Sequence, residues 1–362
     1  MDPPRHILII RPSALGDVCR TVPVLVSLKR RWPEAKVDWL VQRGFEGAIL
    51  GHPDLHEAIP FDRRALSLRR VATGSWRAAM AELMSRLRTP RYDLVVDAQG
   101  LFRSGLFAAM TGSRTRVGYA RAEEFGSIFY SRRIAVDRSA HAVDRMLALV
   151  EGLEVEPVPD MRLYSTPKGR EGLPDTLRGA RFATFAPTSR WPGKRWPQDR
   201  FLEVAKSLLD QGAVEKIAVV GGGNEREQCS LLVEHADVEP RIVDLVGRTD
   251  VETLMAVIES SAIVLANDSA PLHMAVGFHR PLVGLFGPTK IGLVGPYGRS
   301  DDVLQSRVPE DRVSHKDEHE GRRLMAEIET ERVISALLER LDDPRLQSHP
   351  RRHTDTSTIS TP

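Results

Sequence analysis

The stretch at 264–289, VLANDSAPLHMAVGFHRPLVGLFGPT, constrains the fold of this 362-residue chain more than any other. It opens on the end of an apolar run that predicts a buried strand, and the Asn-Asp-Ser triplet at 267–269 then supplies turn residues and a helix N-cap. Pro271 suits the first turn of a helix, and the apolar run at 281–286 predicts the next strand. A strand–turn–helix–strand unit of this kind is typical of a parallel α/β sheet.

The turn at 267–269 places a helix N-terminus at one edge of that predicted sheet. Free backbone N–H groups and the positive end of the helix dipole favour phosphate or pyrophosphate at such a position. An ordinary capped helix in a parallel sheet has the same spacing, so this stretch alone leaves both interpretations open.

Length, charge and cysteine content limit the class of protein. A chain of 362 residues with 41% hydrophobic content is too long for one typical core and suits two α/β domains. Its 51 basic and 49 acidic residues nearly cancel, so nucleic acid is not the expected partner. Cys19 and Cys229 are the only cysteines, and no run approaches the apolar length of a membrane span or a signal peptide. We therefore expect a cytoplasmic protein.

The first half of the chain alternates predicted strands and helices. The predicted strands are 6–10, 36–41, 92–97, 115–119 and 133–136, and the predicted helices begin at Thr21 or cover 45–50, 65–87 and 141–149. Asp17 is expected on the loop beyond the first strand, and the strand at 92–97 delivers Arg103 to the same edge, where ligands bind in open α/β sheets. The Arg-rich helix at 65–87 is expected to be a solvated face, with anionic lipid as the alternative contact.

The second half repeats this architecture. Its predicted strands are 182–186, 216–221, 241–246, 263–266 and 282–286, and its predicted helices are 197–211, 225–236, 251–260, 271–276 and 324–341. The segment at 154–179 is rich in proline and glycine and is the expected linker, with the domain boundary near residue 170. Two Rossmann-like units in tandem leave a cleft between them.

Several loops of the second half carry candidate ligand groups. The glycine triplet at 221–223 follows a strand, as a phosphate-binding turn would, but it lacks GxGxxG spacing and a Walker lysine. Glu225 opens the following helix, where a carboxylate accepts ribose hydroxyls or simply complements the helix dipole. Lys194 lies on a loop between two tryptophans, and His273 lies one turn into the helix after Asp268. A surface lysine and a buried structural histidine are the ordinary alternatives.

No sequence motif indicates a metal or a covalent nucleophile. His315 and His319 have the i,i+4 spacing of metal ligands, but their segment is charged and offers no matching third ligand. The chain also lacks a G-x-S-x-G elbow and a Cys–His pair. We therefore expect no metal and no cofactor.

Five blocks of this sequence, taken in order, resemble glycosyltransferase family 9. They are IRPSALGDVCRTVPVL within 9–25, VVDAQGLFRSGL at 95–106, FYSRRIAVDRSAHAVDR at 129–145, KRWP at 194–197 and the 267–289 stretch. Within the family, the blocks at 95–145 are most similar to the heptosyltransferase I subfamily of lipopolysaccharide synthesis. The similarity runs from about Ile7 to Leu341 and omits only the tail.

This resemblance implies an α/β fold of the GT-B type, with two Rossmann-like domains facing across a cleft. It implies an acceptor-binding domain at 1–170, a nucleotide-sugar-binding domain at 171–320 and a last helix at 321–342 that crosses back to the first domain. Residues 343–362, which have few apolar side chains, are expected to form a disordered tail.

The resemblance also implies residue roles for metal-independent, inverting transfer of heptose from ADP-heptose to Kdo on lipid A at the cytoplasmic membrane face. Asp17 matches the general base, and Lys194 matches the lysine that neutralises the diphosphate. The substrate-binding positions implied with Lys194 are Thr188, Glu225 for the ribose, Asp268 for sugar hydroxyls, the Ser269 and Ala270 amides for phosphate, and His273 in support of that cradle. Arg103 and Arg121 are candidates for the acidic acceptor, with an ordinary surface arginine as the alternative.

Other functions use the same motifs. A family 9 transferase with another donor or acceptor fits every block. A sugar-nucleotide epimerase would turn over donor without acceptor, and a non-catalytic nucleotide-sugar-binding protein could dispense with Asp17. The intact SALGD loop argues against the binding protein.

Overall fold

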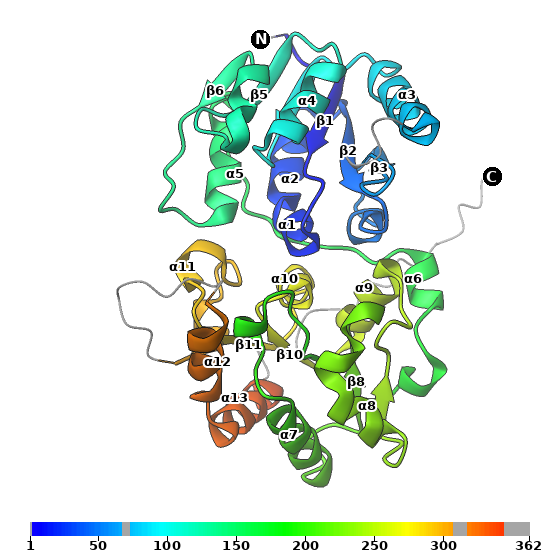
Figure 1. Ribbon diagram of the computed structural model, residues 1–362, viewed down its shortest axis with the longest axis vertical. Coiled ribbons are helices and arrows are strands. Elements are labelled where there is room, and N and C mark those ends of the chain that lie inside the picture. Colours follow the sequence, from blue (N-terminus) through cyan, green and yellow to red (C-terminus); the bar gives the residue numbers. More distant parts are fainter. Residues whose placement is uncertain (1, 67–72, 307–316, 344–362) are drawn as a thin grey trace, which may run out of the picture.

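The computed structural model describes residues 2–66, 73–306 and 317–343 as two stacked α/β units (Figure 1). The first sheet has the order β3-β2-β1-β4-β5-β6 and the second has the order β12-β11-β10-β7-β8-β9. All recorded strand pairs are parallel. The first sheet contains β1 (His6–Ile10), β2 (Lys36–Gln42), β3 (Glu57–Phe61), β4 (Leu94–Asp97), β5 (Thr115–Tyr119) and β6 (Arg132–Ile134). The second contains β7 (Phe182–Ala186), β8 (Lys216–Val219), β9 (Ile242–Asp244), β10 (Ile263–Asn267), β11 (Leu282–Phe286) and β12 (Val303–Gln305).

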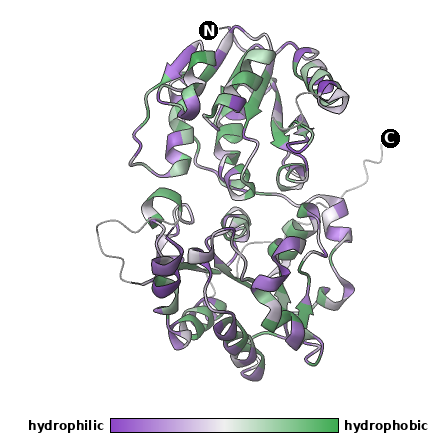
Figure 2. Cartoon of the chain, viewed as in Figure 1, coloured by the Kyte–Doolittle hydropathy of each residue, from purple (hydrophilic) through white to green (hydrophobic). Residues whose placement is uncertain are grey.

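Helices cover both faces of each sheet, so the central strands are apolar along their whole length (Figure 2). The helices of the first unit are α1 (Leu15–Arg20), α2 (Val22–Arg31), η1 (Glu46–Ala48), α3 (Gly74–Arg88), α4 (Phe102–Met110), η3 (Glu123–Phe129) and α5 (Ala142–Glu151). Those of the second are α6 (Pro167–Glu171), η4 (Asp175–Leu177), η5 (Pro192–Lys194), α7 (Gln198–Asp210), η6 (Gly223–Cys229), α8 (Ser230–Ala236), α9 (Val251–Ser260), α10 (Ala270–Gly277), α11 (Ile291–Val294), η7 (Ser300–Asp302), α12 (Glu318–Ala326) and α13 (Thr330–Asp342).

Both sheets reverse their strand order at an equivalent point. In the first sheet β1 lies between β2 and β4, and in the second β7 lies between β8 and β10. The crevice outside the carboxyl ends of the strands at such a switch point is where open α/β sheets bind ligands. The fold therefore selects the loops after β1 and β4, and those after β7 and β10, as the candidate site. Its architecture is the predicted GT-B arrangement.

A shared hydrophobic core and three hydrogen bonds join the units. Buried apolar residues of α1, α2 and α5 form one cluster with those of α9 and α10. Arg20 Nη1 donates to the Val294 carbonyl at 3.0 Å, and the Tyr297 hydroxyl donates to Asp144 at 2.6 Å. The third bond joins His141 Nε2 to the Gly295 carbonyl oxygen at 3.1 Å.

The C-terminal helical segment differs from expectation. Instead of one helix at 324–341, the chain forms α12 and α13, separated at 327–329. The Ile328 carbonyl accepts from Trp196 Nε1 at 3.0 Å and from Arg200 Nη1 at 2.6 Å, and these contacts fix the break. The prediction that the last helix crosses back to the first domain is wrong, because α13 packs its buried face on α7, β10 and β11 of the second unit.

Two further elements correct the sequence prediction. Asp17 lies inside α1 and not on a loop, and the Thr21 hydroxyl donates to the Asp17 carbonyl instead of capping the next helix. Within the described residues, α3 begins at Gly74; residues 67–72 of the expected 65–87 helix, like the tail from 344, lie outside that description. No helix of the described residues is long and apolar enough to cross a membrane.

Candidate active site

Two helix N-termini face each other where the units meet (Figure 1). Helix α1 follows β1 through a short loop, and α10 follows β10. Gly16 allows this approach, because a Cβ added there would lie 2.8 Å from His273 Cδ2 and 3.4 Å from the Ala270 Cα. The two predicted halves of the chemistry, Asp17 on α1 and the 268–270 turn before α10, are therefore brought together.

Asp17 is held between two arginines. Arg11 Nη2 lies 2.9 Å from Asp17 Oδ2, Arg20 Nη2 forms an ion pair with Asp17 Oδ1, and the Ala14 amide donates to Oδ2 at 3.2 Å. Arg11 also donates to the Ala98 carbonyl, so the first switch point fixes one arm of this clamp, while Val294 of the second unit fixes Arg20. Only 22% of the Asp17 side chain is exposed.

The clamp controls the ionisation of Asp17. Burial opposes the charged form, but the Coulombic attraction of Arg11 and Arg20 outweighs it and holds the pKa of Asp17 well below its usual range. Asp17 is therefore a carboxylate at neutral pH, oriented by hydrogen bonds and able to accept a proton.

In the second unit, Asn267 positions the loops around the switch point. Its side chain is fully buried at the end of β10 and accepts from the Trp196 amide at 3.2 Å, while its Nδ2 donates to the Pro187 carbonyl at 2.6 Å. These bonds tie the KRWP loop and the end of β7 to β10. The sequence analysis assigned no such role to Asn267, although a buried amide after a strand is a recognisable signal.

Lys194 and Asp268 form an ion pair on that scaffold. Lys194 Nζ lies 2.6 Å from Asp268 Oδ2, and only 14% and 10% of the two side chains are exposed. The lysine is thus a sheltered ammonium beside the N-terminus of α10 and not a solvated surface group. Its single ionic partner leaves two N–H donors for another anion.

The N-terminus of α10 offers unpaired polar groups. Ser269 is the N-cap residue but makes no side-chain cap, and its buried Oγ has no hydrogen-bond partner among the described residues. The first N–H groups of a helix lack intrahelical partners, so this turn can bind an anion. His273 lies just behind it, 3% exposed, with its Nδ1 unpaired. Burial, followed by the charge of Arg20, holds the pKa of His273 well below its usual value, so the ring is neutral.

Glu225 and Thr188 meet at the neighbouring strand end. The Thr188 hydroxyl donates to Glu225 Oε2 at 3.0 Å, and the Gly222 amide donates to the same oxygen at 2.8 Å. Close packing requires the glycines here: a Cβ on Gly221 would lie 2.8 Å from Thr188 Cγ2, and Gly247, with φ +73°, lies against Gly223. Glu225 Oε1 is left to accept from a ligand.

The first unit contains a cavity of about 430 Å³ at the carboxyl edge of its sheet. Its charged lining comprises Arg11, Arg121, Arg138, Arg145 and Glu123. Arg121, which the sequence analysis weighed against a surface role, lines this cavity, whereas Arg103 is half-buried on α4 and is not among the lining residues. The roles of Arg138 and Arg145 were missed, although both belong to the 129–145 block. An arginine-lined cavity suits an acid-bearing ligand.

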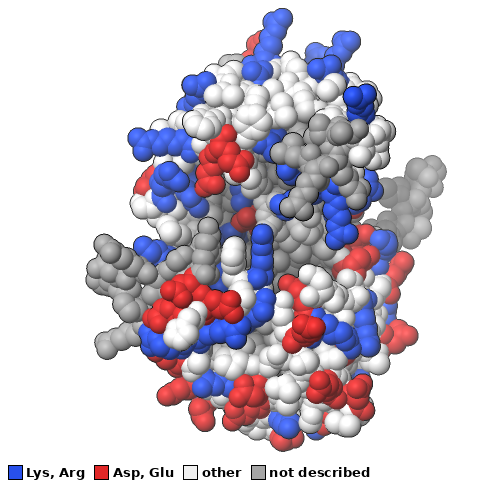
Figure 3. Space-filling view, viewed as in Figure 1, with Lys and Arg blue, Asp and Glu red and all other residues white. Residues whose placement is uncertain are grey.

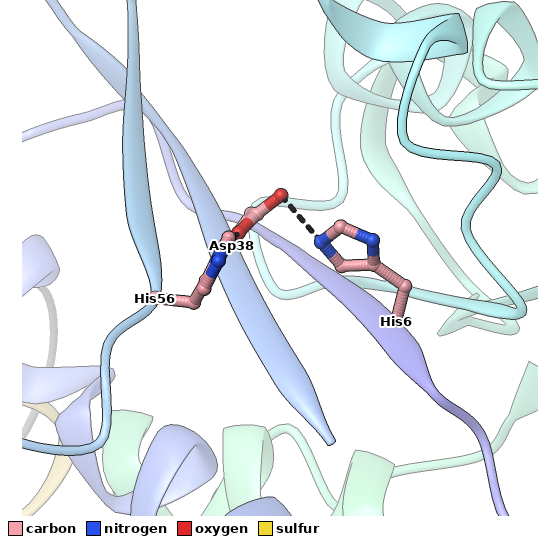
Figure 4. Close-up of side chains that lie close together, drawn as sticks. All are labelled: His6, Asp38 and His56. Carbon is pink, nitrogen blue, oxygen red and sulfur yellow. Dashed lines mark hydrogen bonds and ion pairs between the residues drawn. The ribbon is translucent and has the colours of Figure 1, made fainter. Parts of the chain in front are cut away.

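A separate cluster lies at the opposite edge of the first sheet (Figure 4). His6 Nε2 is 2.9 Å from Asp38 Oδ2, and His56 Nδ1 is 2.8 Å from Oδ1; the three ligand atoms lie within 4.8 Å of one another. The Tyr92 hydroxyl also donates to Asp38, at 2.7 Å. These residues, far apart in sequence, have the chemistry of metal ligands, but in the described structure they already form a hydrogen-bonded set remote from Asp17. His315 of the earlier candidate pair lies outside the described residues, and the expectation of no metal stays a prediction.

Known proteins share this sequence and fold. The sequence model of glycosyltransferase family 9 (heptosyltransferase) matches residues 80–322. Lipopolysaccharide heptosyltransferase 1 of Pseudomonas aeruginosa is 31% identical over 318 residues, 84% of each chain, and its Escherichia coli K12 counterpart is 26% identical over 83% of this chain and 93% of its own. The structure of E. coli ADP-heptose lipopolysaccharide heptosyltransferase II superposes with a TM-score of 0.75 at 23% identity, covering 93% of this chain and 98% of that one. E. coli heptosyltransferase WaaC with ADP gives 0.74 at 24% identity, with 92% and 99% covered.

Proposed function

Because this chain belongs to glycosyltransferase family 9, we propose that it transfers heptose from ADP-heptose to the Kdo-containing inner core of lipopolysaccharide. The observation that carries the proposal is the position of Asp17, opposite the N-terminus of α10 and the Lys194–Asp268 pair. A sugar bound between the two helix ends would have a base on one face and its leaving group on the other, which is what inversion requires.

In the proposed reaction an acceptor hydroxyl oxygen bonds to the anomeric carbon as the bond from that carbon to the diphosphate oxygen breaks. Asp17 takes the hydroxyl proton, and ADP leaves with the bonding electron pair. A carboxylate paired with two arginines is a weak base, so the proton moves late, when bonding to carbon has already made the hydroxyl acidic. Arg11 and Arg20 keep the carboxylate charged and aimed throughout.

The leaving group is stabilised by Lys194 and the α10 N-terminus. Binding of diphosphate would draw Lys194 Nζ from Asp268, and the freed carboxylate could then accept hydroxyls of the sugar. The amides of Ser269 and Ala270 face the same phosphate, with neutral His273 packed behind them. A lysine and a helix dipole together supply the charge stabilisation for which other transferases use a divalent ion.

The rest of the substrates would divide between the units. Glu225 Oε1 and Thr188 are placed for the ribose of ADP, and the arginine-lined cavity is placed for the acidic acceptor. We accordingly assign residues 1–170 to acceptor binding and 171–320 to donor binding, on the cytoplasmic side of the membrane that carries the acceptor.

The test is ADP release by the purified protein with ADP-heptose, with and without Kdo-lipid A, beside the Asp17→Ala variant. Release that requires acceptor and is lost in the variant, while ADP-heptose still binds, is the expected result. Release without acceptor would indicate an epimerase or hydrolase. Tight donor binding with no release would indicate another acceptor or a binding protein, and absence of donor binding would refute ADP-heptose as the donor.

A further inference from the structure

An exposed apolar surface lies beside the arginine-lined cavity. Phe102, Phe125 and Ile128, which we call the apolar loop surface, are 43%, 81% and 60% exposed. Among the described residues only six large hydrophobic side chains are exposed, so half of them gather on α4 and η3, which pack against each other. A cluster of this kind on a soluble domain indicates a binding surface.

The backbone holds this loop firmly while presenting Phe125 to solvent. Glu124 and Phe125 have φ of 51° and 62°, a region that non-glycine residues rarely adopt. Gly126 packs so closely that a Cβ there would lie 2.7 Å from the Leu101 carbonyl oxygen, and the rings of Phe102 and Phe129 stack edge to face at 5.1 Å. The exposure of Phe125 is therefore set by a packed, strained turn.

The apolar loop surface borders the cavity mouth. Leu101 and Glu123, which line the cavity, are close in the chain to Phe102 and Phe125. Any body that covers the apolar loop surface would therefore lie against the opening of the cavity, and a ligand with a polar head and an apolar tail could bridge the two.

The charge around the surface favours an anionic partner. Residues 100–138 contain seven arginines against three acidic residues, Glu123, Glu124 and Asp137. Residues 1–170 contain 27 Lys and Arg against 19 Asp and Glu, a formal charge of +8, whereas residues 171–362 contain 24 against 30, a formal charge of −6. On the face drawn in Figure 3, the charged side chains of the first unit are accordingly mostly basic, and those of the second are mixed.

We propose that Phe102, Phe125 and Ile128 insert into the interfacial layer of an anionic bilayer and hold the mouth of the arginine-lined cavity at the membrane surface. Apolar side chains supply the insertion and the surrounding arginines supply attraction to lipid headgroups. The proposal rests on the proposed function only for the identity of the amphiphile in the cavity. The binding of the bilayer itself requires no substrate.

The test is co-sedimentation with vesicles of phosphatidylethanolamine and phosphatidylglycerol, without any sugar substrate. The double variant Phe125→Ser, Ile128→Ser is compared with Leu231→Ser, Val238→Ser, a matched pair from the second unit that is 40% and 77% exposed. We expect at least about a tenfold loss of vesicle affinity in the first variant and none in the second. Equal affinity in the two variants would overturn the proposal.

Two further arms separate rival explanations. A larger loss in Arg77→Glu, on the exposed face of α3, than in the loop variant would assign binding to the Arg-rich helix and refute the loop. A change from dimer to monomer in sedimentation velocity, with vesicle binding unchanged, would show instead that the surface binds a second copy of the chain.

Activity measurements then distinguish this proposal from the proposed function. We expect the loop variant to keep transfer to a deacylated, water-soluble Kdo acceptor while losing transfer to Kdo-lipid A in vesicles. Equal loss on both acceptors would refute the docking role. An enzyme inactive on every acceptor that still binds vesicles through the loop would refute the proposed function alone.

Discussion

The two switch points have the same strand order but opposite electrostatic designs. At the first, a carboxylate is enclosed by cations, since Asp17 is paired with Arg11 and Arg20. At the second, a cation is held by one carboxylate, since Lys194 is paired with Asp268 alone. A group with two partners and an amide bond is fixed, whereas a group with one partner can exchange it for a ligand. The comparison indicates that the base is preorganised and that the phosphate-binding lysine is released on demand.

Replacement of the fixed group should have the largest effect. Asp17→Asn preserves the size of the side chain but removes the proton acceptor, so we expect kcat to fall by about a thousandfold with little change in ADP-heptose affinity. Steady-state kinetics and calorimetric donor titration measure the two quantities. Asp199→Asn, on the exposed start of α7, is the matched control. More than a tenth of the wild-type kcat in Asp17→Asn would show that another group takes the proton.

Loss of the exchangeable cation should come next. Lys194→Ala removes charge from the leaving group, and we expect kcat/KM to fall by about a hundredfold, with weaker ADP binding. Lys206→Ala, exposed on α7, should behave as wild type. An unchanged ADP affinity in Lys194→Ala would mean that the lysine stays on Asp268 and never reaches the diphosphate.

The exchange itself is tested at Asp268. Asp268→Asn frees Lys194 from its ion pair, so we expect ADP to bind a few times more tightly, by about 1 kcal/mol or less. Transfer should nevertheless slow, because the sugar loses a hydrogen-bond acceptor. The contrast of tighter ADP and slower turnover is read by comparing calorimetry with the rate of ADP release, and weaker ADP binding would refute the release of Lys194 from Asp268.

The smallest effect concerns pH. The pKa of Asp17 is held below its usual range, so lowering the pH from about 8 to 5 should produce no acid limb in kcat/KM that belongs to this residue. The pKa of His273 is also lowered, and that ring stays neutral over the same range. A limb in this range that disappears in Asp17→Asn would contradict the clamp.

The same shift has a consequence for stability. The folded-state pKa of Asp17 lies below its unfolded value, so its ion pairs contribute fully to the free energy of unfolding above the unfolded pKa of about 3.9. That contribution is lost as the pH falls through the folded pKa. Acid unfolding of the wild type and Asp17→Asn should therefore converge only at low pH.

Sequence reasoning located most of the fold because most strands are buried and apolar. The strands at 6–10, 115–119, 182–186 and 282–286 and the helix at 251–260 have the predicted bounds. The strands β3 and β12 were missed because both lie at sheet edges, where burial is weaker and Pro60 is tolerated. The break between α12 and α13 was missed because its cause, the bonds from Trp196 and Arg200, comes from far along the chain.

The sequence by itself determined the elements, their order and the family, because hydrophobic periodicity and contiguous motifs are local properties. It also named Asp17, Lys194 and the turn before α10 one by one. Only the tertiary structure decided what each of them contacts: the pairing of Lys194 with Asp268 spans 74 residues, and the arm that holds Arg20 comes from Val294. Charge, burial and hence basicity depend on these distant neighbours, since electrostatic energy is set by distance in space and not along the chain.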